Sequence, residues 1–274
     1  MFGAVIGDII GSVYEFHNVK TKDFPLWTDR SCFTDDTVCT IAVADALMHG
    51  KRFDTTLREW CRHYPDIGYG QKFKQWVNDD KMPPYHSWGN GAIMRLSPVA
   101  YLSKDRIHAV LNGMDATAIT HNSSEAISAT EAFIDAFYDF QSGVPGDTIR
   151  SALSFRYGYS MNRSVDYIRM NYNHFYVSCH RTLPEAVICV IEAENFEDAI
   201  RNAVSLGGDS DTLAAVAGAL AEARFGVPEE MKSQARSKLD LPMQRVLDKM
   251  YQTPKTIIRQ HFSYHPVTGE KMRD

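Results

Sequence analysis

The sequence predicts an all-α fold in a single compact domain of many helices, on three observations. Apolar residues recur at helical spacing through most of the chain, whereas the period-2 alternation of a β-strand is nowhere sustained. Short loops rich in glycine, proline and small polar residues separate the helical stretches, and no long linker divides them. The 274 residues suffice to bury one substantial core. We therefore expect one domain over residues 1–274, with residues 261–274 as a loosely docked polar tail.

Composition narrows the class of protein. The chain is 44% hydrophobic, carries a formal net charge of -5 and has no cluster of lysine and arginine, which argues against nucleic-acid binding. Five cysteines without a Cys-x-x-Cys pair suggest buried free thiols in a reducing compartment. The N-terminus lacks the basic residues of a signal peptide, and no apolar run approaches the ~20 residues of a membrane span. We expect a soluble, cytoplasmic protein.

The chain is expected to begin with a helix over residues 1–16. Gly3, Gly7 and Gly11 are spaced four residues apart, and such a stripe lets another backbone approach closely. Asp8 and Glu15 would project from the same side of this helix. The favoured interpretation of Asp8 is a carboxylate satisfied by neighbouring N–H donors, and that of Glu15 is a solvated surface acid.

Two acidic motifs each open a helix. After an irregular segment over residues 17–33, Thr34-Asp35-Asp36-Thr37 begins a helix that ends before Gly50. Near the other end, Gly207-Gly208 is expected to end one helix, and Asp209-Ser210-Asp211-Thr212 to begin the next, which stops at Gly226. Between and after these motifs, further helices are expected around residues 55–60, 73–77, 105–119, 126–137 and 229–252.

Three other sequence features lie between the acidic motifs. Ser87-Trp88-Gly89-Asn90-Gly91 precedes a helix expected from Ala92, where backbone N–H groups could bind a phosphate, although Asn-Gly alone favours a tight turn. His121 stands just before a helix capped by Asn122 or Ser123, where a satisfied loop histidine is the more usual interpretation. Thr182-x-x-Glu185 is expected to be a capping box that opens a helix.

If the two acidic helix starts meet, four carboxylates share one spot. Like charges so close cannot all stay ionised without cations between them. Both motifs offer only oxygen donors, which select Mg²⁺, Mn²⁺ or Ca²⁺ over Zn²⁺. Each aspartate could instead cap its own helix, but two Asp pairs, each followed by threonine at a helix start, favour a metal site. Its candidate ligands are Thr34, Asp35, Asp36, Asp209, Asp211 and Thr212.

With these motifs the chain resembles the ADP-ribosylglycohydrolase family. The resemblance covers almost the whole chain, and its most specific part is the pair of acidic motifs in this order. The matching residues are Gly7-Asp8, Gly11, Glu15-Phe16, Phe33 to Thr37, Gly68-Tyr69-Gly70, Gly89 to Arg95, Thr120-His121 and Gly207 to Thr212.

What the resemblance implies is an all-α fold with a dinuclear Mg²⁺ or Mn²⁺ centre in a central cleft. The implied reaction is hydrolysis of the bond between C1″ of ADP-ribose and an acceptor, which is a modified protein or a small ADP-ribose derivative. The arginine linkage is favoured over serine or O-acetyl linkages. The implied catalytic residues are Glu15, Asp36 and Asp209, and the implied metal ligands are the six residues named above. The implied substrate-binding residues are Gly68, Gly70, Ser87, Trp88, Gly89, Asn90, Gly91 and His121, with Trp88 able to stack on adenine.

Two interpretations from other classes stay open. The first is a metal-dependent phosphohydrolase or diphosphate lyase, because aspartate-rich helical sites also bind diphosphates in terpenoid synthases. Against it, Cys39 stands where the third acid of their Asp-Asp-x-x-Asp motif would be. A non-catalytic ADP-ribose-binding protein is the second alternative. A missing Glu15 or a broken Asp209 and Asp211 pair would favour it, and all three residues are present.

Overall fold

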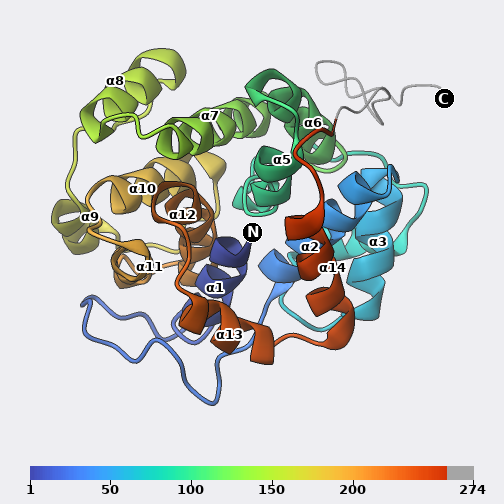
Figure 1. Ribbon diagram of the computed structural model, residues 1–274, viewed down its shortest axis with the longest axis horizontal. Coiled ribbons are helices and arrows are strands. Elements are labelled where there is room, and N and C mark those ends of the chain that lie inside the picture. Colours follow the sequence, from blue (N-terminus) through green and yellow to red (C-terminus); the bar gives the residue numbers. More distant parts are fainter. Residues whose placement is uncertain (258–274) are drawn as a thin grey trace.

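The computed structural model describes residues 1–257, and at its centre α1 (Phe2–Gly11) packs along α12 (Ser210–Phe225) (Figure 1). On one side of this pair lie α7, α10 and α11, and on the other lies α2, which packs on α3 and α14. The other bounds are α2 (Asp35–Met48), α3 (Phe53–His63), α4 (Gln71–Asn78), α5 (Ser97–Leu102), α6 (Arg106–Ala118), α7 (Ser124–Gln141), α8 (Gly146–Tyr157), α9 (Val165–Asn171), α10 (Cys179–Ile191), α11 (Phe196–Ser205), α13 (Glu229–Ser237) and α14 (Leu241–Gln252).

Helices account for the regular structure of residues 1–257. One 3-10 turn lies at Asn90–Ala92. The β-structure in this range consists of two isolated bridges, which pair Gly89 with Ser178 and Ser103 with Ile257. The predicted all-α fold is confirmed. The predicted tail over residues 261–274 lies outside the described residues. No helix among those described has the length and apolar character needed to cross a membrane.

Glycines bring α1 and α12 into backbone contact. A Cβ placed on Gly7 would lie 1.9 Å from the carbonyl oxygen of Ala214, and one placed on Gly3 would lie 2.1 Å from that of Gly218. Every residue of α1 is buried. The glycine stripe therefore allows the close backbone approach that its spacing predicts, and this contact fixes the position of α12 and of its first turn relative to α1.

The first helix ends earlier than predicted. It stops at Gly11 instead of residue 16, and the chain turns away, so Glu15 reaches the site from a loop. The N–H of Ser12 still bonds to the carbonyl oxygen of Asp8 at 2.8 Å, but that of Tyr14 bonds to the carbonyl oxygen of Gly11, only three residues back, at 2.8 Å, so the chain tightens into a turn. The expectation that Asp8 and Glu15 share one helix face is therefore wrong.

Two further helix starts are also corrected. No helix begins at Ala92, because Asn90–Ala92 forms a 3-10 turn and the next α-helix starts at Ser97, where Pro98 suits the first turn. The capping box at Thr182 is wrong as well, because Ser178 caps α10 one turn earlier and accepts from the N–H of Arg181 at 3.2 Å. Thr182 and its predicted partner lie inside α10 and bond to distant residues.

The cysteines are free, as predicted. Four of the five thiols are buried, and only Cys32 is exposed.

Candidate active site

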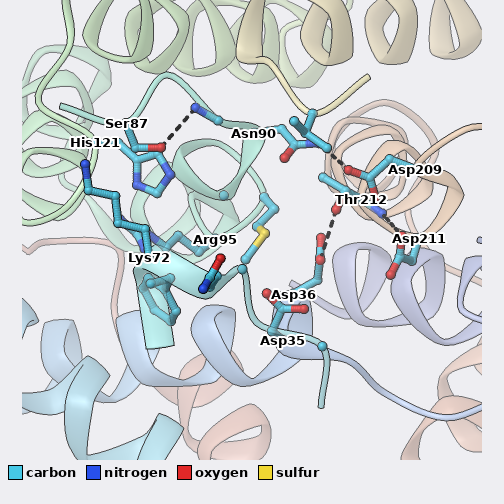
Figure 2. Close-up of a pocket in the computed structure, with 18 of the residues that line it drawn as sticks. Asp35, Asp36, Lys72, Ser87, Asn90, Arg95, His121, Asp209, Asp211 and Thr212 are labelled. Carbon is cyan, nitrogen blue, oxygen red and sulfur yellow. Dashed lines mark hydrogen bonds between the residues drawn. The ribbon is translucent and has the colours of Figure 1, made fainter. Parts of the chain in front are cut away.

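The two acidic motifs meet at the adjacent first turns of α2 and α12 (Figure 2). The Thr212 hydroxyl donates to a carboxylate oxygen of Asp36 at 3.1 Å, which joins the two helix starts directly. Carboxylate oxygens of Asp8, Asp36 and Asp211 lie within 4.8 Å of one another. Those of Glu15, Asp209 and Asp211 form a second such group. The two groups overlap at Asp211.

Burial and mutual repulsion raise the pKa values of four acids at this site, Glu15, Asp35, Asp36 and Asp211. Burial, followed by the charges of Asp8 and Asp209, raises the pKa of Asp35 to about 8. Burial and the same neighbours, with Asp209 ahead of Asp8, raise that of Glu15 to about 7. The pKa values of Asp36 and Asp211 also rise well above the ordinary range, first through burial and then through neighbouring aspartates. Protons or cations must therefore neutralise part of this cluster near neutral pH.

Asp8 lies beneath the cluster and is fully hydrogen-bonded. It accepts from the backbone N–H of Thr34 at 2.9 Å, from that of Thr37 at 3.0 Å, and from both threonine hydroxyls. These contacts agree with the expectation that neighbouring donors satisfy Asp8. Thr34 is also the N-cap of α2, and its hydroxyl accepts from the N–H of Asp36.

The donor set suits a hard divalent cation. One oxygen of Asp36 is buried without a hydrogen-bond partner, although oxygens of an ionised carboxylate ordinarily have one. The surrounding donors are carboxylates and the Thr212 hydroxyl, and within residues 1–257 no His or Cys joins these metal-binding groups. Buried oxygens at this density match the preference of Mg²⁺, Mn²⁺ and Ca²⁺, so these acidic groups could hold a metal ion.

A cavity of about 430 Å³ extends from the acids to an end of opposite charge. Figure 2 shows Lys72, Arg95 and His121 on the side of the pocket away from Asp209 and Asp211. The cavity is therefore bipolar. Its full lining is Glu15, Asp35, Asp36, Gly68, Gly70, Gln71, Lys72, Phe73, Tyr85, Ser87, Gly89, Asn90, Gly91, Met94, Arg95, His121, Phe175, Val177, Asp209, Asp211 and Thr212.

The Gly-Asn-Gly loop connects the two ends. The side-chain amide of Asn90 donates to Asp209 at 2.7 Å and to the Thr182 hydroxyl at 3.2 Å. A Cβ on Gly91 would lie 3.3 Å from the ring of His121, so glycine keeps backbone and imidazole close together. The tight-turn and site interpretations of this loop are therefore compatible, because the turn is what brings Asn90 to the acids.

Arg95 and His121 form the buried part of the basic end. The Arg95 Nη2 donates to the Ala116 carbonyl oxygen at 3.0 Å and to the Thr120 hydroxyl at 2.8 Å, while Nε and Nη1 have no hydrogen-bond partner. Burial, and secondarily the Arg95 charge, lowers the pKa of His121 well below its usual value. His121 is thus neutral at pH 7, and its Nδ1 pairs with the Thr120 hydroxyl at 2.7 Å.

Most of the residues singled out in the sequence line this cavity, and two do not. Thr34 is occupied as the cap of α2, beside Asp8. The side chain of Trp88 is 52% exposed and lies outside the cavity lining.

Sequence reasoning gave no role in the site to several lining residues, chiefly Lys72, Tyr85, Phe175 and Arg95, although Arg95 is among the residues that carry the family resemblance. A signal existed for Arg95, because it is a lone charge in the apolar run from Ala92 to Leu96. No comparable pattern marks the others, which reach the cavity only through tertiary packing. An exposed aromatic pair also stands beside Glu15: the rings of Phe16 and Phe175 are parallel to within 3°, with centroids 6.1 Å apart.

Comparison with known proteins supports the family resemblance. The family model described as ADP-ribosylglycohydrolase matches residues 1–256. The chain belongs to this family. It is 26% identical over 265 residues to "ADP-ribosylarginine hydrolase Tri1" of Pseudomonas putida (strain GB-1), covering 83% of this chain and 70% of that protein. It is 22% identical over 315 residues to "ADP-ribosylhydrolase ARH3" of Mus musculus, covering 86% and 85%.

A solved structure shares the fold. The chain superposes on a structure titled "ADP-ribosylglycohydrolase-related protein complex" with a TM-score of 0.66, at 22% identity, covering 92% of this chain and 95% of the other. The predicted family is confirmed, and with it the class of enzyme, a glycosidic-bond hydrolase acting on ADP-ribose linkages.

Proposed function

We propose that this protein removes ADP-ribose from an arginine side chain by hydrolysing the C1″–N bond, with divalent cations in the acidic cluster. The observation that carries the proposal is the bipolar cavity. ADP-ribose combines a diphosphate, which needs donors and positive charge, with a distal ribose diol, which suits a metal-binding acidic site. One cavity offers both environments at opposite ends.

The acidic end would hold two Mg²⁺ or Mn²⁺ ions. Asp35, Asp36, Asp209, Asp211 and Thr212 supply oxygen donors facing the cavity, and Thr34 would need to release its contacts with Asp8 to join them. When bound, such ions neutralise the crowded carboxylates and fix the ribose hydroxyls. The number of acids and their raised pKa values favour two ions over one.

The basic end would hold the diphosphate. Arg95 brings a buried cation with two nitrogens, Nε and Nη1, left without a partner, and Lys72 brings a second positive charge to the same side. Ser87 adds a neutral hydroxyl at the same end, and His121 is positioned as a neutral partner. The N–H groups of Gly89 and Asn90 already bond to the Ser87 hydroxyl and to the Val177 carbonyl oxygen, so they shape the loop. Buried charge-assisted hydrogen bonds of this kind bind phosphates strongly because water does not compete.

Glu15 is suited to move the proton. Its pKa of about 7 lets it accept a proton from the attacking water and release it again at neutral pH. The C1″–N bond breaks, the water oxygen bonds to C1″, and the proton passes through Glu15 to the departing guanidine nitrogen. Asp209 and Asp211 lie close to Glu15 and would stabilise the oxocarbenium character that develops at C1″.

The aromatic pair favours arginine as the acceptor. Phe16 is 77% exposed and follows Glu15, and its partner Phe175 lines the cavity. A planar guanidinium stacks well on such rings, whereas a serine side chain offers them nothing comparable. The Pseudomonas putida relative is named as an ADP-ribosylarginine hydrolase, which supports the same choice.

The test is release of free ADP-ribose from arginine- and serine-linked peptides and from O-acetyl-ADP-ribose, with Mg²⁺, with Mn²⁺ and with EDTA. We expect metal-dependent release, fastest from the arginine peptide and lost in Asp36→Ala and Asp209→Ala. Phe16→Ala is expected to lower kcat/KM for the arginine peptide by about tenfold, in line with a cation–π contribution. Faster release from serine or O-acetyl substrates would reassign the linkage. ADP-ribose binding without any release would favour the non-catalytic alternative.

A further inference from the structure

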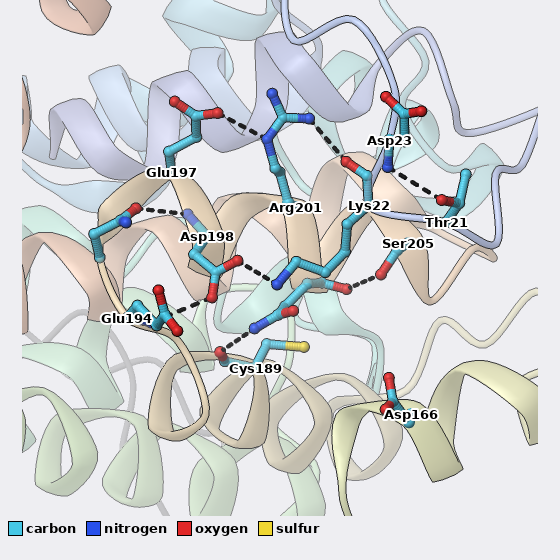
Figure 3. A network of polar contacts seen from close by, with 12 residues as sticks. Thr21, Lys22, Asp23, Asp166, Cys189, Glu194, Glu197, Asp198, Arg201 and Ser205 are labelled. Atoms are coloured by element: carbon cyan, nitrogen blue, oxygen red, sulfur yellow. Dashed lines mark hydrogen bonds and ion pairs between the residues drawn. The ribbon is translucent and has the colours of Figure 1, made fainter.

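The loop that carries Glu15 is fastened to α11 by its distal half (Figure 3). Lys22 forms an ion pair with Asp198. Arg201 donates through one nitrogen to the carbonyl oxygens of Lys22 and Phe24, each at 2.9 Å, and is itself paired with Glu197 at 2.7 Å. These contacts dock the loop on α11, but they lie several residues beyond Glu15.

Closer to Glu15, a single side chain joins the loop to the second acidic motif. Asn18 donates to the carbonyl oxygens of Tyr14 and Glu15, at 2.7 and 2.9 Å. The same amide donates to the carbonyl oxygen of Gly208 at 3.1 Å and accepts from the Gly208 N–H at 2.8 Å. Asn18 therefore bonds the backbone of Glu15 and the residue immediately before Asp209 at once.

The Gly208 side of this junction has little room to adjust. Gly207 and Gly208 both adopt positive φ, 74° and 69°. A Cβ on Gly207 would lie 3.1 Å from the Asn18 side-chain oxygen, and one on Gly208 would lie 2.7 Å from the ring of Tyr172. Lys20 closes the end of α11 by donating to the carbonyl oxygens of Leu206 and Tyr172. Asn18, Lys20 and Tyr172 thus hold this turn in place. A shift of Asn18 would therefore also move the backbone next to Asp209.

We propose that Asn18 is a positioning residue that sets the distance between the Glu15 carboxylate and the pair Asp209 and Asp211. The inference rests on the proposed function, and it adds a residue that touches neither substrate nor metal. Its basis is that carboxylate oxygens of Glu15, Asp209 and Asp211 lie within 4.8 Å of one another although they come from two separate segments. Asn18 ties these segments directly, because it makes two hydrogen bonds to Gly208 while the same amide group bonds the carbonyl oxygens of Tyr14 and Glu15.

Removing Asn18 leaves the rest of the dock in place. The Lys22 ion pair and the Arg201 contacts do not involve Asn18, so the loop stays on α11 in its absence. The expected defect is a shift of Glu15 by a fraction of an ångström to about an ångström. A displacement of this size costs up to about 10²-fold in rate when it misplaces a reacting group.

The experiment compares Asn18→Ala and the isosteric Asn18→Asp with Lys22→Ala, a control in the same loop that loses only the distal ion pair. For each folded variant, kcat and KM on ADP-ribosyl-arginine peptide and the Kd of ADP-ribose are measured. We expect both Asn18 variants to lower kcat by about 10–100-fold, with KM and Kd within about twofold of the wild type. Asn18→Asp keeps an acceptor for the Gly208 N–H but loses three donations to carbonyls. Lys22→Ala is expected to retain wild-type kcat.

A double-mutant cycle with Glu15→Gln separates positioning from a general structural role. If Asn18 acts through Glu15, adding Asn18→Ala to Glu15→Gln lowers kcat by less than about twofold, because the group being positioned is already disabled. Additive losses, or wild-type kcat in Asn18→Ala, would overturn the inference while leaving the proposed function intact. A wild-type protein that releases no ADP-ribose from any substrate would overturn both.

Discussion

At the scale of single residues, Arg95 is the most informative side chain to which sequence reasoning gave no role in the site. It is fully buried, yet its Nε and Nη1 have no hydrogen-bond partner. Burying a guanidinium without hydrogen-bond partners for all its nitrogens destabilises the folded state, so such a residue usually has a functional role. Its place at the basic end of the cavity indicates that role, since a bound diphosphate would complete its hydrogen bonds.

Arg95→Lys is therefore expected to weaken ADP-ribose binding by about 10–100-fold, equivalent to the roughly 1.5–3 kcal/mol of a charged hydrogen bond. The chain contains a matched control. Arg58 is also buried, stacks on Trp76 and donates to three backbone carbonyls away from the cavity. Arg58→Lys should lower the melting temperature and leave the Kd of ADP-ribose unchanged. Calorimetric titration checks both, and equal Kd values in the two variants would exclude Arg95 from phosphate binding.

At the scale of helices, local signals predicted starts and close approaches well. The helix start at Thr34, the helix start predicted with Asn122 or Ser123 as its cap, and the helix end at Gly207 and Gly208 each follow from rules that involve a few neighbouring residues. The capping box at Thr182 failed for the complementary reason. Ser178 competes for the same helix start, and the hydroxyl of Thr182 accepts from Asn90, 92 residues away in sequence.

The candidate site shows the same contrast between residues marked by local sequence patterns and residues placed by distant contacts. Its acids could be found because they repeat one pattern at two helix starts, and their meeting was a condition that the sequence alone left open. Lys72, Tyr85 and Phe175 could not be found, since only packing of distant loops brings them to one cavity. Glu15 was placed on a helix that in fact ends at Gly11, because the tightening of the chain into a turn between Gly11 and Tyr14 is not visible in local periodicity.

The α1–α12 contact gives a stability prediction at this scale. Gly7→Ala would place a Cβ 1.9 Å from the Ala214 carbonyl oxygen, so the two backbones must separate. We expect a loss of about 2–4 kcal/mol in the free energy of unfolding, since overpacking usually costs 1–3 and here the obstacle is backbone. Gly70→Ala is the control, because nothing lies within 4 Å of its added Cβ. Urea unfolding compares the variants, and similar midpoints would show that α1 and α12 can move apart freely.

At the scale of the whole molecule, the acidic cluster opposes folding once its protons leave. A carboxyl group whose pKa is raised in the folded state binds more protons there than in the unfolded chain, so stability falls as pH rises through that window. For Asp35 the window runs from its ordinary value near 4 to about 8, and for Glu15 from about 4.5 to about 7. Asp54 and Asp45 act in the opposite direction, because their lowered pKa values give stability that is lost only as pH falls below about 4.

Without divalent cations, the protein should therefore be most stable near pH 5 and lose stability steadily toward pH 8. Mn²⁺ should reverse this loss, because cations bind the deprotonated acids of the folded state and replace the missing protons. The measurement is the melting temperature from pH 4.5 to 8.5, in EDTA and in Mn²⁺, where each kcal/mol corresponds to about 2–4 °C for a chain of this size. Asp211→Asn removes one buried charge, so in EDTA at pH 8 it should melt above the wild type, yet gain little from Mn²⁺. A wild-type melting temperature that is flat between pH 5 and 8 in EDTA, or a Mn²⁺ gain equal at both pH values, would mean that the crowded carboxylates are neutralised in some way other than by exchangeable protons and cations.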